Sequence, residues 1–235
     1  MELFRNAKLI DQLITYLTRF ITSERERKLL DVLHQRTRYI TVVLEDLYQT
    51  QNMSAVLRSC ECYGVQDIHI IENSNEFKIH HAISMGADKW LSLHNYENSS
   101  HNLQDCVLGL REKGYQIIAT SLTSDAIPIQ DLPIDQPLAF CFGTELTGLS
   151  KECLQLADRH VTIPMYGFTE SLNISNAVAI TLSYIIEKIR KANVPWELSD
   201  EERKHLYLEW LQTSIRDSSW IIQDFLSQID NKKEC

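Results

Sequence analysis

The residues whose side chains are best suited to take part in a reaction fall in three short stretches. Each stretch lies where a predicted strand is followed by a predicted helix. Asn52 and Arg58 lie in the first stretch, Glu145 lies in the second, and Ser171 and Asn173 lie in the third. A guanidinium can stabilise a developing oxyanion or clamp a phosphate, and neither role requires it to lose its charge. Because ligands of open α/β sheets bind beyond the carboxyl ends of the strands, these three junctions form the predicted site.

Each of these side chains also has a simpler structural interpretation. Asn52 can cap the amino end of one helix, and Ser171 or Asn173 can cap a later one. Glu145 lies near a predicted helix start, where a carboxylate is electrostatically favourable. A single helical arginine such as Arg58 is most often a surface cation. Taken one at a time, the stretches therefore leave structural and functional interpretations open.

The backbone of the second and third stretches is predicted to be permissive. Of the seven glycines in the chain, three lie in the segment that runs from Gly143 through Gly148 to Gly167. Glycine accepts positive φ angles and lets a ligand approach backbone groups closely, whereas Pro164 offers no backbone donor. This composition predicts that a ligand or a neighbouring segment lies against the backbone here.

Short apolar runs that alternate with helical patterns indicate the elements that position these residues. The strand-like runs are YITVVL, DIHIIE, WLSL, YQIIAT, LAFCFG and HVTIP. Helical patterns lie between or after them, at residues 52–63, 98–113, 151–157 and 173–191. Such alternation predicts an α/β fold, in which a mostly parallel sheet carries helices on both faces.

Helical patterns also flank this core on both sides. After the core, Pro195 ends one helix, and Ser199 with Glu202 forms a capping box that starts another. The tail carries too many large apolar residues to remain free, so we expect it to dock on the core or on a second subunit. These residues are Trp210, Ile215, Trp220, Ile221 and Phe225. The predicted organisation is an amino-terminal helical extension over 1–37, a core over 38–192 and a carboxy-terminal helical extension over 193–235.

Composition limits the class of protein. A chain of 235 residues can bury a full core, and it has neither the apolar run of roughly 20 residues that crosses a bilayer nor a signal-peptide pattern. Its six cysteines form no C-x-x-C pair and no metal-ligand spacing, which favours reduced thiols in a cytoplasmic protein. Rossmann, Walker, nucleophile-elbow and H-E-x-x-H motifs are missing, which disfavours the sites they form.

The net charge of −9 argues against indiscriminate binding of nucleic acid. A nucleic-acid partner would need a local basic patch, and SERERKLLDVLHQRTRY is one candidate segment. Its basic residues are Arg25, Arg27, Lys28, Arg36 and Arg38. A solvated helix face with mixed charge pairs is the alternative interpretation.

Taken together, the stretches NMSAVLRSCECYGV, FGTELTGLS and IPMYGFTESLNISNAVAI resemble the three motifs of the SpoU branch of the SPOUT RNA methyltransferases, in order and in spacing. The resemblance covers residues 38–190. Because helical segments flank the core, the chain is similar within that branch to the TrmH family of transfer-RNA guanosine 2′-O-methyltransferases. The resemblance implies methyl transfer from S-adenosylmethionine to a ribose 2′-hydroxyl, with a guanosine in the D-loop of tRNA as the expected target.

The same resemblance implies features that periodicity does not reveal. It implies a deep trefoil knot that holds the cofactor, and a homodimer. The implied cofactor-binding residues are Thr120, Gly143, Ile163, Met165, Leu172 and Asn173. The implied catalytic residues are Asn52, Arg58, Glu145, Ser171 and Asn173.

Family proposals make the motif arginine a base, but a guanidinium resists deprotonation, so we expect Arg58 to act by electrostatics and positioning. Asn52, Ser171 and Asn173 would orient it or the ribose, and Glu145 would shape the site. Predicted RNA contacts are the basic residues named above together with Arg203 and Lys204 of the tail. Two alternatives stay open, a ribosomal-RNA 2′-O-methyltransferase and a catalytically silent RNA-binding dimer.

Overall fold

The computed structural model describes residues 7–231, with side chains described for 8–229. Contacts divide the chain into two compact units. One unit is Thr37–Trp196, and the other combines the described residues up to Arg36 with those from Glu197 onward. The predicted boundaries at 38 and 192 lie close to these limits, whereas the two helical extensions, expected to be separate, form one unit.

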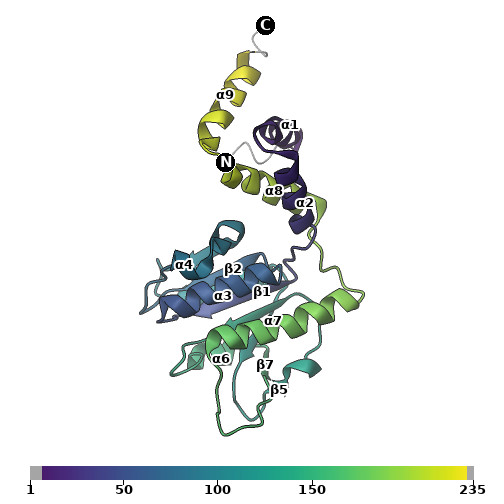
Figure 1. Cartoon of the computed structure of the whole chain (residues 1–235). Helices are drawn as coiled ribbons and strands as arrows, with labels where there is room; N and C mark the ends of the chain where they lie inside the picture. The colour runs from purple at the N-terminus through teal and green to yellow at the C-terminus, as the bar shows by residue number, and fades with distance from the viewer. Residues whose placement is uncertain (1–6, 232–235) are drawn as a thin grey trace. The chain divides into compact units, whose positions relative to one another are not determined.

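A seven-stranded, entirely parallel sheet forms the centre of the first unit (Figure 1). Along the sheet the strand order is β3-β2-β1-β6-β4-β7-β5. The α/β class and the parallel sheet that the sequence predicted are thus confirmed. The strands are β1 (Ile40–Glu45), β2 (Asp67–Ile71), β3 (Ser92–Tyr96), β4 (Gln116–Thr120), β5 (Ile127–Pro128), β6 (Leu138–Phe142) and β7 (Arg159–Thr162).

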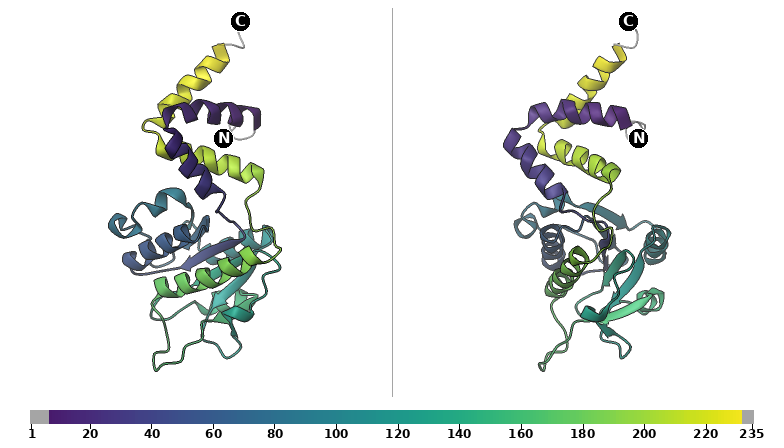
Figure 2. Two further views of the ribbon diagram at one scale, coloured as in Figure 1. Left: turned by 45° about the vertical axis from the view of Figure 1, so that its right-hand side comes forward. Right: turned by 90° about the vertical axis from the view of Figure 1, so that its right-hand side faces the viewer.

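Helices cover both faces of this sheet, as Figure 2 shows. The pair α3 (Thr50–Cys62) and α7 (Ile174–Lys191) pack side by side on one face, over a core that includes Phe140 and Leu182. The other face carries α5 (Asn102–Glu112) and α6 (Lys151–Leu156), over a second core. The central strands β1 and β6 are mostly apolar because both of their faces are buried.

Four short elements in the described part of this unit were not predicted from the sequence. They are α4 (His81–Ser84), the 3₁₀ turns η3 (Ala87–Trp90) and η4 (Ile129–Asp131), and strand β5. Each is four residues or shorter, so none of them contains a full period of the apolar pattern that reveals a helix or a strand. The third predicted strand, WLSL, is also displaced, since β3 begins at Ser92.

Helices alone form the second unit. The tail packs on the amino-terminal helices within one unit, a contact that the sequence analysis did not name, and its docking on a second subunit stays a prediction. Trp210, Ile215 and Phe225 are buried there, Phe225 lies 5.0 Å from the ring of Tyr16, and Trp220 is exposed. The helices are α1 (Ala7–Leu17), η2 (Thr18–Phe20), α2 (Ser23–Leu33), α8 (Asp200–Ser214) and α9 (Ser218–Asn231).

The predicted capping box of α8 is confirmed, since Ser199 and Glu202 exchange both hydrogen bonds. Among the described cysteines, four are buried free thiols and Cys62 is exposed, while Cys235 lies outside the described residues. No helix in residues 7–231 is long and apolar enough to span a membrane.

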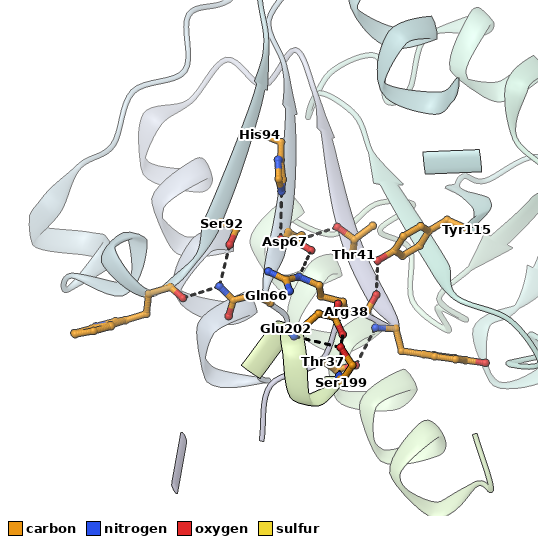
Figure 3. Close-up of polar contacts among 12 residues, drawn as sticks. Thr37, Arg38, Thr41, Gln66, Asp67, Ser92, His94, Tyr115, Ser199 and Glu202 are labelled. Atoms are coloured by element: carbon orange, nitrogen blue, oxygen red, sulfur yellow. Dashed lines mark hydrogen bonds and ion pairs between the residues drawn. The ribbon is translucent and has the colours of Figure 1, made fainter. Parts of the chain in front are cut away.

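Polar side chains gather at the amino ends of β1, β2 and β3, at the edge of the sheet opposite the predicted site (Figure 3). The Asp67 carboxylate accepts hydrogen bonds from Arg38 Nε at 2.8 Å and faces His94 Nε2 at 3.2 Å. Burial would raise the pKa of Asp67, but its contacts with His94 and Arg38 outweigh burial and hold that pKa below its ordinary value. Arg38 therefore has a structural partner within its own unit.

His69 lies beside this cluster and is buried between two rings. It stacks on His94 at 4.6 Å between centroids, and its Nδ1 lies 2.9 Å from the Tyr96 hydroxyl. Burial lowers the pKa of His69 to about 3. The folded chain therefore keeps this imidazole neutral at pH values where the unfolded chain protonates it.

We expect the free energy of unfolding to fall by up to about 1.4 kcal/mol for each pH unit below roughly 6.5, because only the unfolded state gains this proton. His69→Gln removes the titrating group and should therefore reduce the change in the free energy of unfolding with pH. Urea denaturation at pH 7.5, 6.0 and 5.0 measures the slope, and exposed His101→Gln serves as the control. Equal slopes in the His69 variant and the wild type would contradict this expectation.

Candidate active site

A cavity of about 480 Å³ opens at the carboxyl ends of the strands, within the sheet unit. Three loops line it, those that follow β4, β6 and β7, and α7 closes it on a fourth side. The loop after β7 is the green segment that extends below the sheet in Figure 1. The cavity thus occupies the position that the strand-to-helix junctions predicted.

Most of the residues predicted to hold a cofactor line this cavity. They are Thr120, Gly143, Ile163, Met165 and Leu172. Asn173 is not among the lining residues, although its neighbours Leu172 and Ile174 are. The Thr120 hydroxyl donates to the Cys141 carbonyl at 2.7 Å, which fixes the end of β4 against β6.

A chain of hydrogen bonds links the three sequence stretches at the cavity's edge. The Asn52 amide donates to the Glu145 carboxylate, and the Asn173 amide donates to Asn52 Oδ1 at 3.1 Å. Glu145 and Ser171 both line the cavity. Glu145 and Asn173 lie 93 and 121 positions after Asn52 in the sequence, and the fold brings both into contact with it.

Asn52 does not cap its helix, and that prediction is wrong. The helix α3 begins earlier, at Thr50, with Gln49 at the N-cap position and no capping side chain. Asn52 therefore lies inside the first turn, where its amide is available to Gln49, Glu145 and Asn173. Asn173, in contrast, is the predicted N-cap of α7 and accepts from the Ser175 backbone N–H at 2.9 Å.

Arg58 is separate from the cavity of its own chain. Six residues after Asn52 on α3, it lies roughly 9 Å further along the helix axis. Its side chain is exposed, it does not line the cavity, and it makes no hydrogen bond or ion pair with any residue in 7–231. The Arg58 guanidinium is thus free to contact a group outside the chain.

The backbone of Gly143 passes very close to Gly148. A Cβ atom at Gly143 would lie 2.2 Å from the Gly148 carbonyl carbon, a distance that real Cβ atoms do not show. Gly148 has a positive φ of 69°, and Thr144 and Gly148 exchange backbone hydrogen bonds at 3.0 Å. Gly167 does not use the positive φ that a glycine permits. Glycine is therefore required in the loop after β6, for tight closure of the loop.

Sequence reasoning missed Glu45, the last residue of β1. Glu45 is buried, and its carboxylate accepts from the Ser150 backbone N–H at 2.8 Å and from the Ser150 hydroxyl at 2.6 Å. Ser150 in turn caps α6. The available signal was a carboxylate that ends an otherwise apolar strand, because such a group needs buried partners. Glu45 anchors the far end of the loop that starts at Gly143.

Glu45→Gln should lower the free energy of unfolding by about 1–3 kcal/mol, because the amide cannot accept both hydrogen bonds from Ser150. The loop after β6 loses its anchor, so we also expect weaker binding of whatever ligand fills the cavity. Urea denaturation and calorimetry measure the two effects. Glu187→Gln, an exposed carboxylate on α7, is the matched control, and equal behaviour of the two variants would contradict the anchoring role.

The predicted RNA contacts differ in how they are placed. Arg36 is 1% exposed and stacks on the Trp210 ring at 5.2 Å, so it is not available to RNA, and that prediction is withdrawn. Arg38 pairs with Asp67. The remaining five lie in the helical unit; two of them, Arg203 and Lys204, pair with acidic residues, and Arg25 hydrogen-bonds to a serine. Arg27 and Lys28 are exposed on α2.

Comparison with known proteins identifies relatives of this chain. Residues 39–183 match the model of the SpoU rRNA Methylase family. A tRNA (guanosine(18)-2′-O)-methyltransferase of Borreliella burgdorferi is 39% identical over 208 residues, which cover 88% of this chain and 94% of that protein. The enzyme of the same name from Thermus thermophilus is 35% identical over 161 residues, covering 68% of this chain and 81% of that protein.

Solved structures resemble the fold in the same way. The crystal structure of an Aquifex aeolicus TrmH/SpoU tRNA modifying enzyme aligns with a TM-score of 0.72 at 28% identity, over 83% of this chain and 98% of that chain. The SpoU methyltransferase AviRb of Streptomyces viridochromogenes, in complex with AdoMet, aligns with a TM-score of 0.59 at 23% identity, over 69% and 65% of the two chains. At this lower identity the similarity shows the fold alone.

Proposed function

The chain belongs to the SpoU rRNA methylase family, and from this membership we propose that it transfers a methyl group from S-adenosylmethionine to the ribose 2′-hydroxyl of guanosine 18 in tRNA. The observation that carries the proposal is the 39% identity to a tRNA (guanosine(18)-2′-O)-methyltransferase across 94% of that enzyme. The hydrogen bonds from Asn52 to Glu145 and from Asn173 to Asn52 add support, because they join all three motifs at one cavity.

The cavity suits S-adenosylmethionine in size and in chemistry. Its volume of about 480 Å³ falls within the usual range for small-molecule sites. Its lining is largely apolar with several hydroxyls, and among residues 7–231 only Glu145 contributes a charged side chain to it. A carboxylate at this position favours a cationic ligand, and the cofactor's chemistry is to offer a methyl group on a positively charged sulfur. Thr120, Gly143, Ile163, Met165 and Leu172 would hold it.

The chain's own residues would then orient the ribose. Ser171 lines the cavity, and the Glu145–Asn52–Asn173 hydrogen bonds fix the ends of the loops around it. Alignment of the 2′-oxygen with the methyl carbon and the sulfur supplies much of the rate in a direct displacement. These residues therefore act as positioning groups, and Arg58 would stabilise the negative charge that develops on the 2′-oxygen.

We also propose that the chain works as a homodimer. The helix α7 exposes apolar Ile180 and Tyr184, side chains of the kind that a subunit contact covers. Arg58 does not line the cavity of its own chain, and a second copy gives its guanidinium a route to a cavity. A sedimentation mass near 27.3 kDa, that of one chain, would contradict this proposal.

The deep trefoil knot and the cytoplasmic location stay predictions. The strand order supports the knot, because β6 lies between β1 and β4 although it follows both in the sequence. The loops after β6 and β7, where a knot would hold the cofactor, line the same cavity.

RNA would be gripped by few side chains, since the chain carries a net charge of −9. Phosphate contacts dominate RNA affinity, so local basic groups must supply it. Exposed Arg27 and Lys28 on α2 are the clearest such groups in the helical unit.

Incubation of the purified chain with labelled S-adenosylmethionine and separate tRNA and ribosomal-RNA pools tests the proposed function. We expect label in tRNA, and mapping of the modified ribose should place it at guanosine 18. Label in ribosomal RNA alone would favour the alternative substrate. Label in neither pool would favour a silent RNA-binding dimer.

A further inference from the structure

Thr181 of α7 is a buried polar group whose hydroxyl none of the described residues satisfies. Thr181 is fully buried and lines the cavity. A helical threonine hydroxyl commonly bonds to a carbonyl three or four residues earlier, but the Thr181 hydroxyl has no hydrogen-bond partner among residues 7–231. Buried hydroxyls without partners are uncommon because each costs free energy. The missing partner is therefore expected within the cavity.

The two ends of this cavity differ in character. Thr181, Ile129, Phe142 and Val161 all line the cavity and are nearly fully buried, so we assign them to its deep end. Glu145, Ser171 and Leu172 are more exposed, and they form the outer end. A ribose that belongs to a folded RNA can approach only the outer end, so the reactive methyl group must lie there.

The deep end also restricts which part of the cofactor it can accept. None of the described residues contributes a charged side chain to this end, and burial of an unpaired ammonium or carboxylate is costly. The amino-acid portion of the cofactor is therefore excluded from this end. Adenine is uncharged, flat and largely apolar on its faces, and it carries ring nitrogens and an amine that need hydrogen-bond partners. A single hydroxyl among apolar side chains matches that chemistry, because a hydroxyl both donates and accepts.

We propose that the Thr181 hydroxyl is a cofactor-binding group that hydrogen-bonds the adenine of S-adenosylmethionine. This rests on the proposed function, which names the cofactor but assigns nothing to Thr181. The hydroxyl selects for the base and anchors the buried end of the cofactor. The sulfonium then lies toward Glu145 and Ser171.

Calorimetric titration of the full chain with two ligands tests the proposal. S-adenosylhomocysteine carries both the adenine and the amino acid, whereas 5′-methylthioadenosine carries the adenine alone. Thr181→Val keeps the shape and removes the hydroxyl, so it should weaken both ligands by about tenfold. Thr181→Ser keeps the hydroxyl and should bind both within about twofold of the wild type.

A stability measurement separates this role from a structural one. Without ligand, Thr181→Val should match or exceed the thermal midpoint of the wild type, because a methyl group replaces an unpartnered hydroxyl. A clear drop in the midpoint would show that the hydroxyl has a partner within the chain, and would overturn the proposal.

Two binding outcomes would also overturn the proposal. Wild-type affinity of Thr181→Val for both ligands would mean that the hydroxyl contacts neither, and weakening of S-adenosylhomocysteine alone would place the hydroxyl at the amino acid. Failure of the wild type to bind either ligand is a different result, which would overturn the proposed function and the proposal together.

Discussion

Arg58→Ala should lower methyl transfer by at least about a hundredfold while it leaves the affinity for S-adenosylhomocysteine within about twofold of the wild type. The reason for the first effect is that a guanidinium at the developing 2′-oxyanion stabilises the transition state more than the ground state. The reason for the second is that Arg58 is exposed and does not line the cavity. Single-turnover kinetics and calorimetry measure the two quantities.

Two variants make the Arg58 result specific. Arg58→Lys keeps the positive charge but loses the planar group of donors. If Arg58 acts by its charge, this variant should therefore keep part of the activity. Arg159→Ala removes an exposed arginine at the start of β7, at the opposite end of the sheet, and should transfer methyl groups normally. Comparable loss of cofactor binding in Arg58→Ala would contradict the assignment, because it would place Arg58 in the cofactor site.

Gly143→Ala should abolish detectable cofactor binding and lower the free energy of unfolding by about 1–3 kcal/mol. The added Cβ would lie 2.2 Å from the backbone of Gly148, so the loop over residues 143–149 cannot keep its closed form. That loop contributes much of the cavity lining, including Glu145. The substitution therefore acts through the backbone rather than by simple filling of the cavity.

Gly109→Ala is the matched control for this variant. Gly109 lies within α5, where an added Cβ meets nothing within 4 Å. Alanine has a higher helix propensity than glycine, so the free energy of unfolding of this variant should rise by roughly 0.5–1 kcal/mol. Its cofactor binding should be normal. Urea denaturation and calorimetry compare the pair. Retained binding in Gly143→Ala would show that the tight closure of the loop is not needed for the site.

Six of the seven strands of the described sheet and the four longest helices around it were predicted from the sequence because their apolar patterns are regular, whereas β5 was missed. The sequence also predicted the strand-to-helix junctions at which the cavity lies, since Gly143, Asn173 and their neighbours concentrate turn residues after strands. The contacts within the candidate site were harder to predict from the sequence. The start of α3 differed by two residues from the expected one, and that difference turned Asn52 from a helix cap into the hydrogen-bond partner of Glu145 and Asn173.

Tertiary packing determines the environment of several residues whose roles local sequence patterns do not reveal. Arg36 looks like part of a basic patch in the sequence, yet it is buried against Trp210, a residue 174 positions later that no local pattern relates to it. Glu45 and Thr181 were missed for the same reason. The role of Glu45 depends on its contact with Ser150, and that of Thr181 depends on its hydroxyl having no partner within residues 7–231. Neither fact can be known without the fold.

The most direct test of the proposed function compares two tRNAs that differ in one oxygen atom. One carries guanosine at position 18, the other carries 2′-deoxyguanosine there, and both are incubated with the full chain and methyl-labelled S-adenosylmethionine. We predict stoichiometric label in the first tRNA and none in the second, because the second lacks the accepting 2′-hydroxyl. Equal labelling of both would contradict ribose methylation at guanosine 18.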